Sequence, residues 1–253
     1  MHLNTALDFT QDTPGYRDAM KNDKFLGLVP SECDPDARSP KMKECQNYLY
    51  NNRELPNGEL FFLRQDFKWN DIQFSSDSII ASLRYKKFYP EIIEIASERK
   101  DYRKWVDGFI GEAYTIGGIM LFPVPYKQKT INVARGPSNP TVFERFDLTL
   151  ECIKGHYDGV ETFRNGKDEV LQAVNRNADY FDKFQDFKGY VDFFFLQDIV
   201  DNSYNVRRFV DYLGKPNKKD YWTFMDNQMK FLRERNARIS KIDFEYLPEE
   251  LAL

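Results

Sequence analysis

The positions of the prolines divide this chain into two parts that must fold differently. Five prolines fall within the first sixty residues: Pro14, Pro30, Pro35, Pro40 and Pro56. Proline fixes φ and removes a backbone donor, so long regular elements are not expected there. From residue 141 onward, apolar residues recur at helical spacing over several segments. The sequence therefore predicts an irregular N-terminal part and a helical C-terminal part.

Within the first 140 residues, three short runs are predicted to be β-strands: 59–67, 115–122 and 129–134. The last two are joined by a loop that contains Pro123 and Pro125, which predicts an antiparallel hairpin. One helix is expected earlier, from Pro40 to about Asn51, with Ser39 as its N-cap. Strands followed by helices indicate an α+β fold.

The length of 253 residues and an apolar content of 42% suit a globular chain with a substantial core. We predict a single, mainly helical domain over residues 1–253. Within it we expect an irregular segment over 1–58, a sheet-containing part over 59–140 and a helical part over 141–246. With 16% aromatic residues, ring packing should dominate the core.

Composition also excludes several classes of partner. A formal net charge of −4 argues against nucleic-acid binding, which needs a basic face. No apolar stretch reaches the roughly 18 residues that span a bilayer, and no signal-peptide pattern opens the chain. The three cysteines form no CxxC pair. A cytosolic protein without a membrane partner is expected, and composition sets no oligomeric state.

The small number of histidines and the lack of known binding motifs limit the cofactors and metals that this chain is expected to bind. Only two histidines occur, His2 and His156, so a zinc site built on two or three histidines is not expected. The GxGxxG dinucleotide fingerprint is missing from the sequence, and so is the GxSxG elbow of a hydrolase. We expect no cofactor and no metal. The pair Asp34 and Asp36 could hold a hard cation, but its spacing favours a solvated or capping role.

The segment 141–157, predicted to be one helix, carries candidate site residues. At helical spacing Arg145, Thr149 and His156 share one narrow stripe beside the apolar face, together with Cys152. Asp147, Glu151 and Lys154 are expected on the solvent side. A partly desolvated arginine needs an anionic partner. For Arg145 that partner is either a ligand phosphate or carboxylate, or an internal acid such as Asp77 or Glu112.

A second group of candidates lies at the end of the third predicted strand. Arg135 is followed by Gly136, whose backbone amide could approach an anion. Asn132 is expected on the opposite strand face from Arg135. The pair Gly117 and Gly118 interrupts the second predicted strand, either for close packing or for the approach of a ligand.

Several long blocks then resemble a known family. The blocks are DPDARSP at 34–40, LPNG at 55–58, SSDSII at 75–80, YTIGGIMLFP at 114–123, TINVARG at 130–136, RFDLTLECIKGHY at 145–157 and FKGYVDFFFLQDIV at 187–200. They are similar to a bacterial domain family of unknown function, over most of the chain. The resemblance implies a bacterial or phage-borne intracellular protein and carries no activity or site.

Two functional hypotheses follow from these residues. In the first, the protein binds a small anionic or nucleotide-like ligand in a pocket and is an enzyme if His156 moves a proton. Arg135 and Arg145 would neutralise the anion, with Asn132, Gly136 and Thr149 orienting it. If carboxylates take part, Asp77 and Asp147 are the nearest. In the second, the protein is a non-catalytic interaction or regulatory module that uses an aromatic surface within 212–231.

Overall fold

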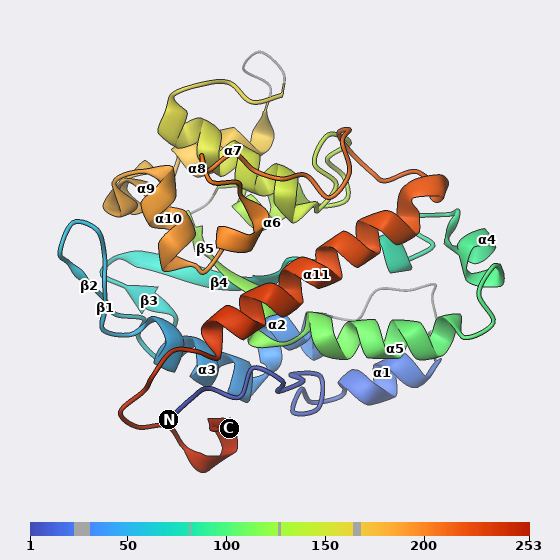
Figure 1. Cartoon of the computed structure of the whole chain (residues 1–253), viewed down its shortest axis with the longest axis horizontal. Coiled ribbons are helices and arrows are strands. Elements are labelled where there is room, and N and C mark those ends of the chain that lie inside the picture. The colour runs from blue at the N-terminus through green and yellow to red at the C-terminus, as the bar shows by residue number, and fades with distance from the viewer. Residues whose placement is uncertain (23–30, 81, 126–127, 164–167) are drawn as a thin grey trace.

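A three-stranded antiparallel sheet packs among helices in the computed structural model, which describes residues 1–22, 31–80, 82–125, 128–163 and 168–253 (Figure 1). The strand order is β3 (Lys68–Trp69), β4 (Ile72–Ser78) and β5 (Ile119–Val124). The β4–β5 register runs from Gln73 opposite Val124 to Ser78 opposite Ile119. A separate two-stranded ribbon pairs β1 (Arg53–Glu54) with β2 (Leu60–Phe61). The predicted α+β fold is confirmed.

Helices surround this sheet. In the described part of the chain they are α1 (Tyr16–Asn22), α2 (Pro35–Arg38), α3 (Pro40–Tyr50), α4 (Ile92–Ser97), α5 (Tyr102–Ala113), α6 (Ile131–Arg135), α7 (Phe146–Asp158), α8 (Glu169–Asn175), α9 (Ala178–Phe181), α10 (Phe187–Phe193) and α11 (Tyr221–Ile239). Figure 1 shows α11 crossing the molecule diagonally, with α7 and α8 on one side of it and α3 and α5 on the other. None of the helices in the described ranges is long and apolar enough to cross a membrane.

The start of α3 follows the local rules by which it was predicted. Pro40 occupies the first helical position, where its missing N–H costs nothing. The Ser39 hydroxyl accepts the backbone N–H of Met42 at 3.0 Å, which satisfies one donor of the first turn. The predicted helix from Pro40 to about Asn51 is therefore confirmed within one residue.

The expected strand over 129–134 is wrong, because this segment forms helix α6. The Thr130 side chain accepts the N–H of Val133 at 3.1 Å and caps the helix. A short apolar run fits a helix or a strand equally well, and here the cap decides between them. The partner of β5 is consequently β4 and not the segment that follows β5. The run 59–67 likewise forms only the two residues of β2 before it turns.

The paired glycines before β5 serve close packing. They lie in a short 3-10 turn, Ile116–Gly118, against α11. A Cβ atom at Gly117 would lie 2.5 Å from the Asn236 side-chain oxygen, and one at Gly118 only 1.7 Å from the Ala113 carbonyl. The buried Arg235 of α11 completes the contact by donating to the Gly117 carbonyl at 2.8 Å. A larger residue at Gly117 would collide with α11, and one at Gly118 would collide with the backbone at the end of α5.

Aromatic rings fill the space between the sheet and the C-terminal helices. Tyr50 of α3 stacks on Phe193 of α10 with ring centroids 5.8 Å apart. Phe184 contacts Tyr190 and Phe194 at centroid distances of 5.3 and 5.5 Å. These distances are typical of favourable offset and edge-to-face pairs. The expectation of a ring-dominated core is confirmed for this part of the molecule.

Candidate functional site: a small cavity of carboxylates and arginines

A small cavity of about 130 Å³ lies where α2, β4 and the end of α5 meet the turn before α7. Six ionisable side chains with opposite charges line it: Asp34, Asp36, Asp77, Glu144, Arg84 and Arg135. The phenols of Tyr85 and Tyr114 line it as well. Such a concentration of titratable groups around a recess is the usual mark of a binding or catalytic site.

Helix α2 brings two of the carboxylates into this cavity. Pro35 sits at the first position of this short helix, between Asp34 and Asp36. Asp36 is 9% exposed and accepts the backbone N–H of Ser78, in β4, at 3.0 Å. Asp34 makes no side-chain capping bond, and its Oδ1 is buried without a hydrogen-bond partner. Asp34 does stand at the N-cap position of α2, whereas the expected solvated position is wrong for Asp36, which is buried against β4.

Burial changes the acidity of these carboxyl groups. It raises the pKa of Asp34, and it raises that of Asp36 well above the usual range, with further increases from the charges of Asp34 and Asp77. The pKa of Asp77 rises to about 6 because burial outweighs the opposing charge of Arg135. Asp34 and Asp36 also hydrogen-bond to each other. The Asp36 carboxyl is therefore harder to ionise than an exposed aspartate, and the Asp34 carboxyl shares this direction of shift.

Arg84 supplies a positive charge whose partners are unusual. The side chain is 5% exposed, and its Nη2 donates to the hydroxyls of Tyr85 and Tyr114. The guanidinium also lies 4.4 Å from the centre of the Tyr85 ring. Its Nε is buried without a hydrogen-bond partner. The bonds of this guanidinium thus go to neutral phenols, and one donor is left unused.

Arg135 lies at the C-terminal end of α6 and is nearly saturated. Its Nη1 donates to Asp77 Oδ2 at 2.7 Å and to the Ser78 carbonyl at 3.3 Å. The Nη2 donates to the Glu144 carbonyl, and Nε donates to the Thr149 hydroxyl at 3.1 Å. The predicted ligand-binding residue Arg135 therefore does line the cavity, but it chiefly positions Asp77. Thr149 supports Arg135 from behind and does not line the cavity.

The turn before α7 presents Glu144 to the cavity from a strained backbone. Phe143 and Glu144 have φ values of 48° and 58°, a region that residues other than glycine rarely adopt. The Glu144 carboxylate accepts the backbone N–H of Ser82 at 2.7 Å. This bond ties the 3-10 turn η2 (Ser82–Arg84) to the cavity wall. Strain of this kind tends to be kept where a side chain must be aimed.

Arg145 does not line the cavity, and its guanidinium is bonded to groups inside the fold. Helix α7 begins at Phe146, so Arg145 is its N-cap and does not share the helical stripe expected for it. Asp147 is fully buried, which makes its predicted solvent-side position wrong. The two form an ion pair at 2.5 Å, and the Arg145 guanidinium also donates to the carbonyls of Val210, Tyr212 and Gly214. The internal-partner alternative for Arg145 holds, with Asp147 as the acid.

His156 also lies away from the cavity. Its ring nitrogens lie 2.9 Å from the Asn175 side-chain oxygen and 3.2 Å from an Asp182 oxygen. The ring packs against Phe181 with centroids 5.7 Å apart. Arg135 therefore lines the cavity and His156 does not; the His156 ring lies where α7 meets α8 and α9.

The other sequence candidates lie along α6 outside the cavity lining. Asn132 donates to the Ser75 hydroxyl at 3.1 Å, and Gly136 caps the C-terminal end of α6.

The expected aromatic surface within 212–231 is mostly internal, since Tyr221 and Phe224 are both fully buried. Tyr212 and Trp222 of the same segment are partly exposed, and an interaction role for this segment stays a prediction.

Sequence reasoning missed Arg84, Tyr114, Glu144 and the role of Asp34 with Asp36. One signal was available for the aspartates, because Pro35 between them predicts a helix start with Asp34 as its N-cap residue. Arg84 and Tyr114 carried no comparable local signal.

Within the described ranges, no group of three or more His, Cys, Asp or Glu side chains is placed to hold a metal ion.

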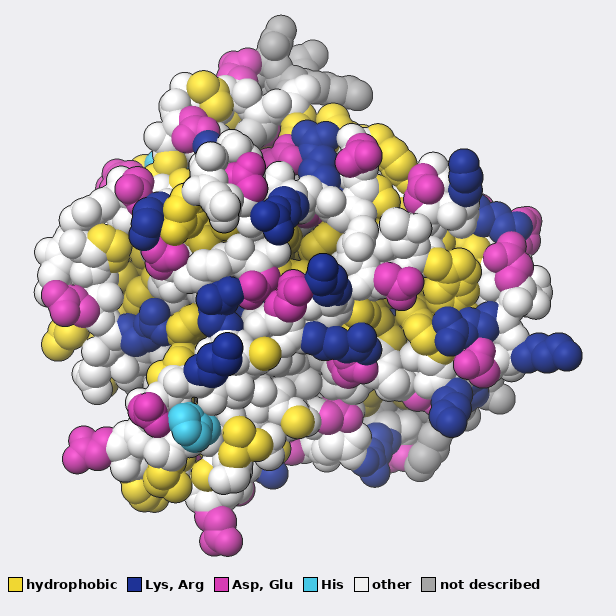
Figure 2. All heavy atoms as spheres, in the orientation of Figure 1, with side chains coloured by type: hydrophobic (Ala, Val, Ile, Leu, Met, Phe, Trp, Pro, Cys, Tyr) yellow, Lys and Arg dark blue, Asp and Glu magenta, His cyan; other side chains and the backbone are white. Residues whose placement is uncertain are grey.

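Charges elsewhere on the surface are mixed. Figure 2 shows Lys and Arg side chains interspersed with Asp and Glu over the face in view, without an extended area of one sign. A nucleic-acid-binding face would instead gather positive charge. That the protein does not bind nucleic acid stays a prediction, and the mixed charges on this face agree with it.

Comparison with known families bears on the whole chain. DUF6994, a family of unknown function, matches residues 3–239. The chain belongs to this family. Every ionisable residue that lines the cavity falls inside the span matched by DUF6994, whereas the segment after 239 falls outside it. No curated protein and no solved structure matched the chain.

Proposed function

We propose that this DUF6994 protein binds the anionic head group of a small polar ligand in the cavity and acts on it by general acid–base catalysis. The observation that carries this proposal is a pair of unpartnered buried atoms, Arg84 Nε and Asp34 Oδ1. Leaving a buried polar atom without a hydrogen bond costs about 1–3 kcal/mol. A ligand that offers one acceptor and one donor would recover that cost on both sides.

The size of the cavity limits what enters it. At about 130 Å³ it is smaller than the roughly 300–1,000 Å³ of pockets that enclose a whole organic ligand. It suits a single group such as a carboxylate or a phosphate, with the rest of the molecule outside. Arg84 supplies the planar donor geometry that recognises such anions. A protonated Asp36 would add a further donor, so the acidic lining does not repel the anion as strongly as its formal charge implies.

The raised pKa of Asp36 supports its role as the proton donor. In this scheme the O–H bond of the Asp36 carboxyl breaks as its proton passes to an oxygen of the bound group, which leaves Asp36 as a carboxylate. Asp77, held by Arg135 at 2.7 Å, is the residue that would accept a proton in return. Two carboxyls with different environments are a common means of assigning acid and base roles.

A thermal-shift screen tests the binding step. Acetate, inorganic phosphate and adenosine monophosphate, each at several millimolar, would be added to the wild type and to an Arg84→Met variant. We expect at least one of these to raise the melting temperature of the wild type, since ligands stabilise only the folded state, and to leave the variant unchanged. Equal shifts in both proteins, or no shift with any anion, would contradict the proposal.

A specific observation also favours the second candidate function, a non-catalytic interaction role. An open groove with exposed aromatic side chains is lined in part by α3 and shares no lining residue with the cavity. The features of this groove do not require catalysis.

A further inference from the structure

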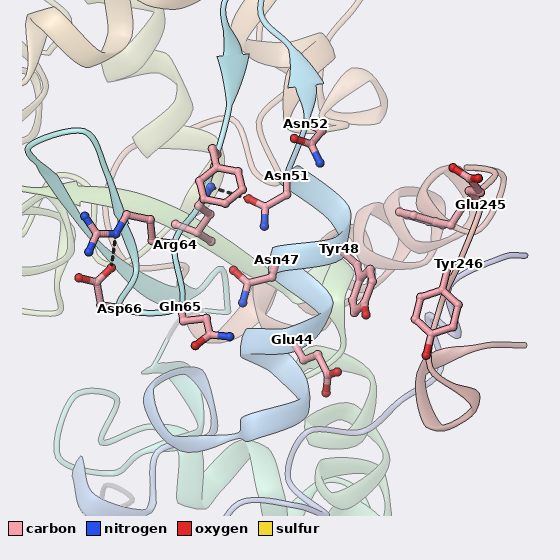
Figure 3. Close-up of a pocket in the computed structure, with 13 residues that line it drawn as sticks. Glu44, Asn47, Tyr48, Asn51, Asn52, Arg64, Gln65, Asp66, Glu245 and Tyr246 are labelled. Carbon is pink, nitrogen blue, oxygen red and sulfur yellow. Dashed lines mark hydrogen bonds and ion pairs between the residues drawn. The ribbon is translucent and has the colours of Figure 1, made fainter.

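A surface groove of about 910 Å³ runs between α3, the segment after β2 and the segment after α11 (Figure 3). It shares no lining residue with the carboxylate and arginine cavity. We call it the α3 groove. Its volume falls near the upper end of the range for ligand-binding pockets, about 300–1,000 Å³.

Aromatic side chains stand on both sides of the α3 groove. Tyr48 projects from α3, and Tyr246 faces it from the segment after α11 (Figure 3). Tyr246 is 66% exposed and Phe62, on the neighbouring wall, is 51% exposed. Burial raises the pKa of Tyr48, and smaller increases come from Tyr246, Glu44 and Glu250, which shows that these groups lie close together. Exposed rings around a hollow are typical of binding surfaces.

The charge of the α3 groove is negative. Three carboxylates line it, Glu44, Asp66 and Glu245, against one arginine, Arg64. Arg64 lies 3.3 Å from Asp66, so its charge is already balanced. Counting formal charges, three acids and one base leave a net charge of −2. The groove therefore suits a cation, and two tyrosine rings beside a carboxylate form a setting for cation–π contact.

Amide side chains provide the remaining polar lining. Asn47 of α3 and Gln65 of the facing segment project into the same hollow (Figure 3). The Asn47 Oδ1 atom is buried and has no hydrogen-bond partner. Each primary amide offers both donors and an acceptor, which is the pattern that a peptide backbone requires from its binding site. A simple amine would leave the amide donors unused.

The walls of the α3 groove are held in place before any ligand binds. Asn51 accepts the backbone N–H of Leu63 at 2.5 Å, which fixes the segment after β2 against α3. On the other wall the Phe244 N–H donates to the Met1 carbonyl at 2.8 Å, and Leu247 is buried. A preformed groove avoids part of the ordering cost of association.

We propose that the α3 groove binds a basic peptide segment of a partner protein. A lysine or arginine side chain of that segment lies between Tyr48 and Tyr246 with its charge near Glu44. The peptide backbone bonds to Asn47 and Gln65. This site is independent of the proposed cavity function, since it uses different residues and a ligand of opposite charge.

Fluorescence anisotropy with a labelled probe tests this assignment. The probe is an acetylated and amidated octapeptide of alternating lysine and glycine, and the control probe has glutamate in place of lysine. We expect saturable binding of the lysine peptide that weakens as salt is raised, because charges at the surface are screened. The glutamate peptide should not bind. Failure of the wild type to bind the lysine peptide would overturn the proposal.

Matched variants locate the binding. Glu44→Gln and Tyr246→Ala should each weaken binding by about three- to thirtyfold, the range of a cation–π or paired-charge contact of intermediate strength. Glu161→Gln removes the same charge from an exposed residue outside the groove and should leave binding unchanged. Melting curves of the variants would confirm that they fold. Equal losses in all three variants would indicate nonspecific charge attraction and contradict the assignment.

A further comparison separates a peptide site from a site for free amines. Asn47→Ala should weaken peptide binding while leaving competition by spermidine unchanged. If spermidine displaces the peptide fully and Asn47→Ala has no effect on either ligand, the groove recognises an amine alone, and the peptide assignment is wrong.

Discussion

Two buried arginines of this fold differ in how their donors are used. Arg145 is fully buried, and its guanidinium reaches both oxygens of Asp147 and the carbonyls of Val210, Tyr212 and Gly214. Arg84 is 5% exposed, bonds to two phenols and leaves Nε without a partner. Burial alone therefore does not distinguish a structural arginine from one available to a ligand. The distinction lies in how completely its donors are used.

The largest effect is expected at the saturated arginine. Arg145→Met leaves the Asp147 carboxylate buried without its counter-charge and three carbonyls without a donor, so it should lower the free energy of unfolding by about 3–5 kcal/mol. Urea denaturation would measure this. Arg103→Met, at a side chain that is 46% exposed, should change stability by less than about 0.5 kcal/mol. A loss below 1 kcal/mol in Arg145→Met would break the comparison.

Asp36→Asn tests the carboxyl side of the cavity through its pH dependence. The folded-state pKa of Asp36 lies above its unfolded value, so the folded wild type keeps a proton that the unfolded chain loses. Its stability then falls by up to about 1.4 kcal/mol per pH unit as the pH rises from roughly 4 to the folded-state pKa. The asparagine variant lacks this loss and can still accept the Ser78 N–H.

Stability of the two proteins should therefore agree near pH 4, with the variant more stable at pH 8. Denaturation at several pH values would show this divergence. Parallel stability curves across that range would mean that Asp36 ionises normally in the folded protein.

A smaller effect is expected at His156. His156→Gln removes contacts to Asn175 and Asp182 at the margin of the core and should cost about 1 kcal/mol, the value of one typical hydrogen bond. Anion-induced thermal shifts should be unaffected, because His156 does not line the cavity. Loss of those shifts in the variant would restore the sequence-based catalytic hypothesis for this residue.

Arg84→Met should change stability least, although it makes the same chemical change as Arg145→Met. The substitution removes a buried charge with an unused donor and replaces it with an apolar chain of similar length, so the net change should stay within about 1 kcal/mol. Binding of the active anion from the thermal-shift screen should be lost nonetheless. If Arg84→Met destabilises the fold as strongly as Arg145→Met, Arg84 is a structural residue too.

Sequence patterns predicted the fold class and helix α3, because capping and proline rules act locally. They could not place the third expected strand, since INVAR fits helix and strand alike until Thr130 is seen to cap it. At the site these patterns identified Arg135 and named Asp77. They also placed Arg145 on one face of a helix over 141–157, but the helix begins at Phe146, one residue after Arg145. Arg84 and Tyr114 could not be found, because their meeting depends on how η2 and α5 pack, and no local pattern records that.

The spread of the cavity residues along the chain has a consequence for folding kinetics. They come from positions between 34 and 144, and α2 meets β4 across 42 residues in the bond from Ser78 to Asp36. Contacts between distant residues carry a loop-closure cost and form late when that cost is not offset early. Substitutions at Asp34 or Asp36 should therefore alter the unfolding rate more than the refolding rate. The site would be among the last features to assemble in each new copy of the protein.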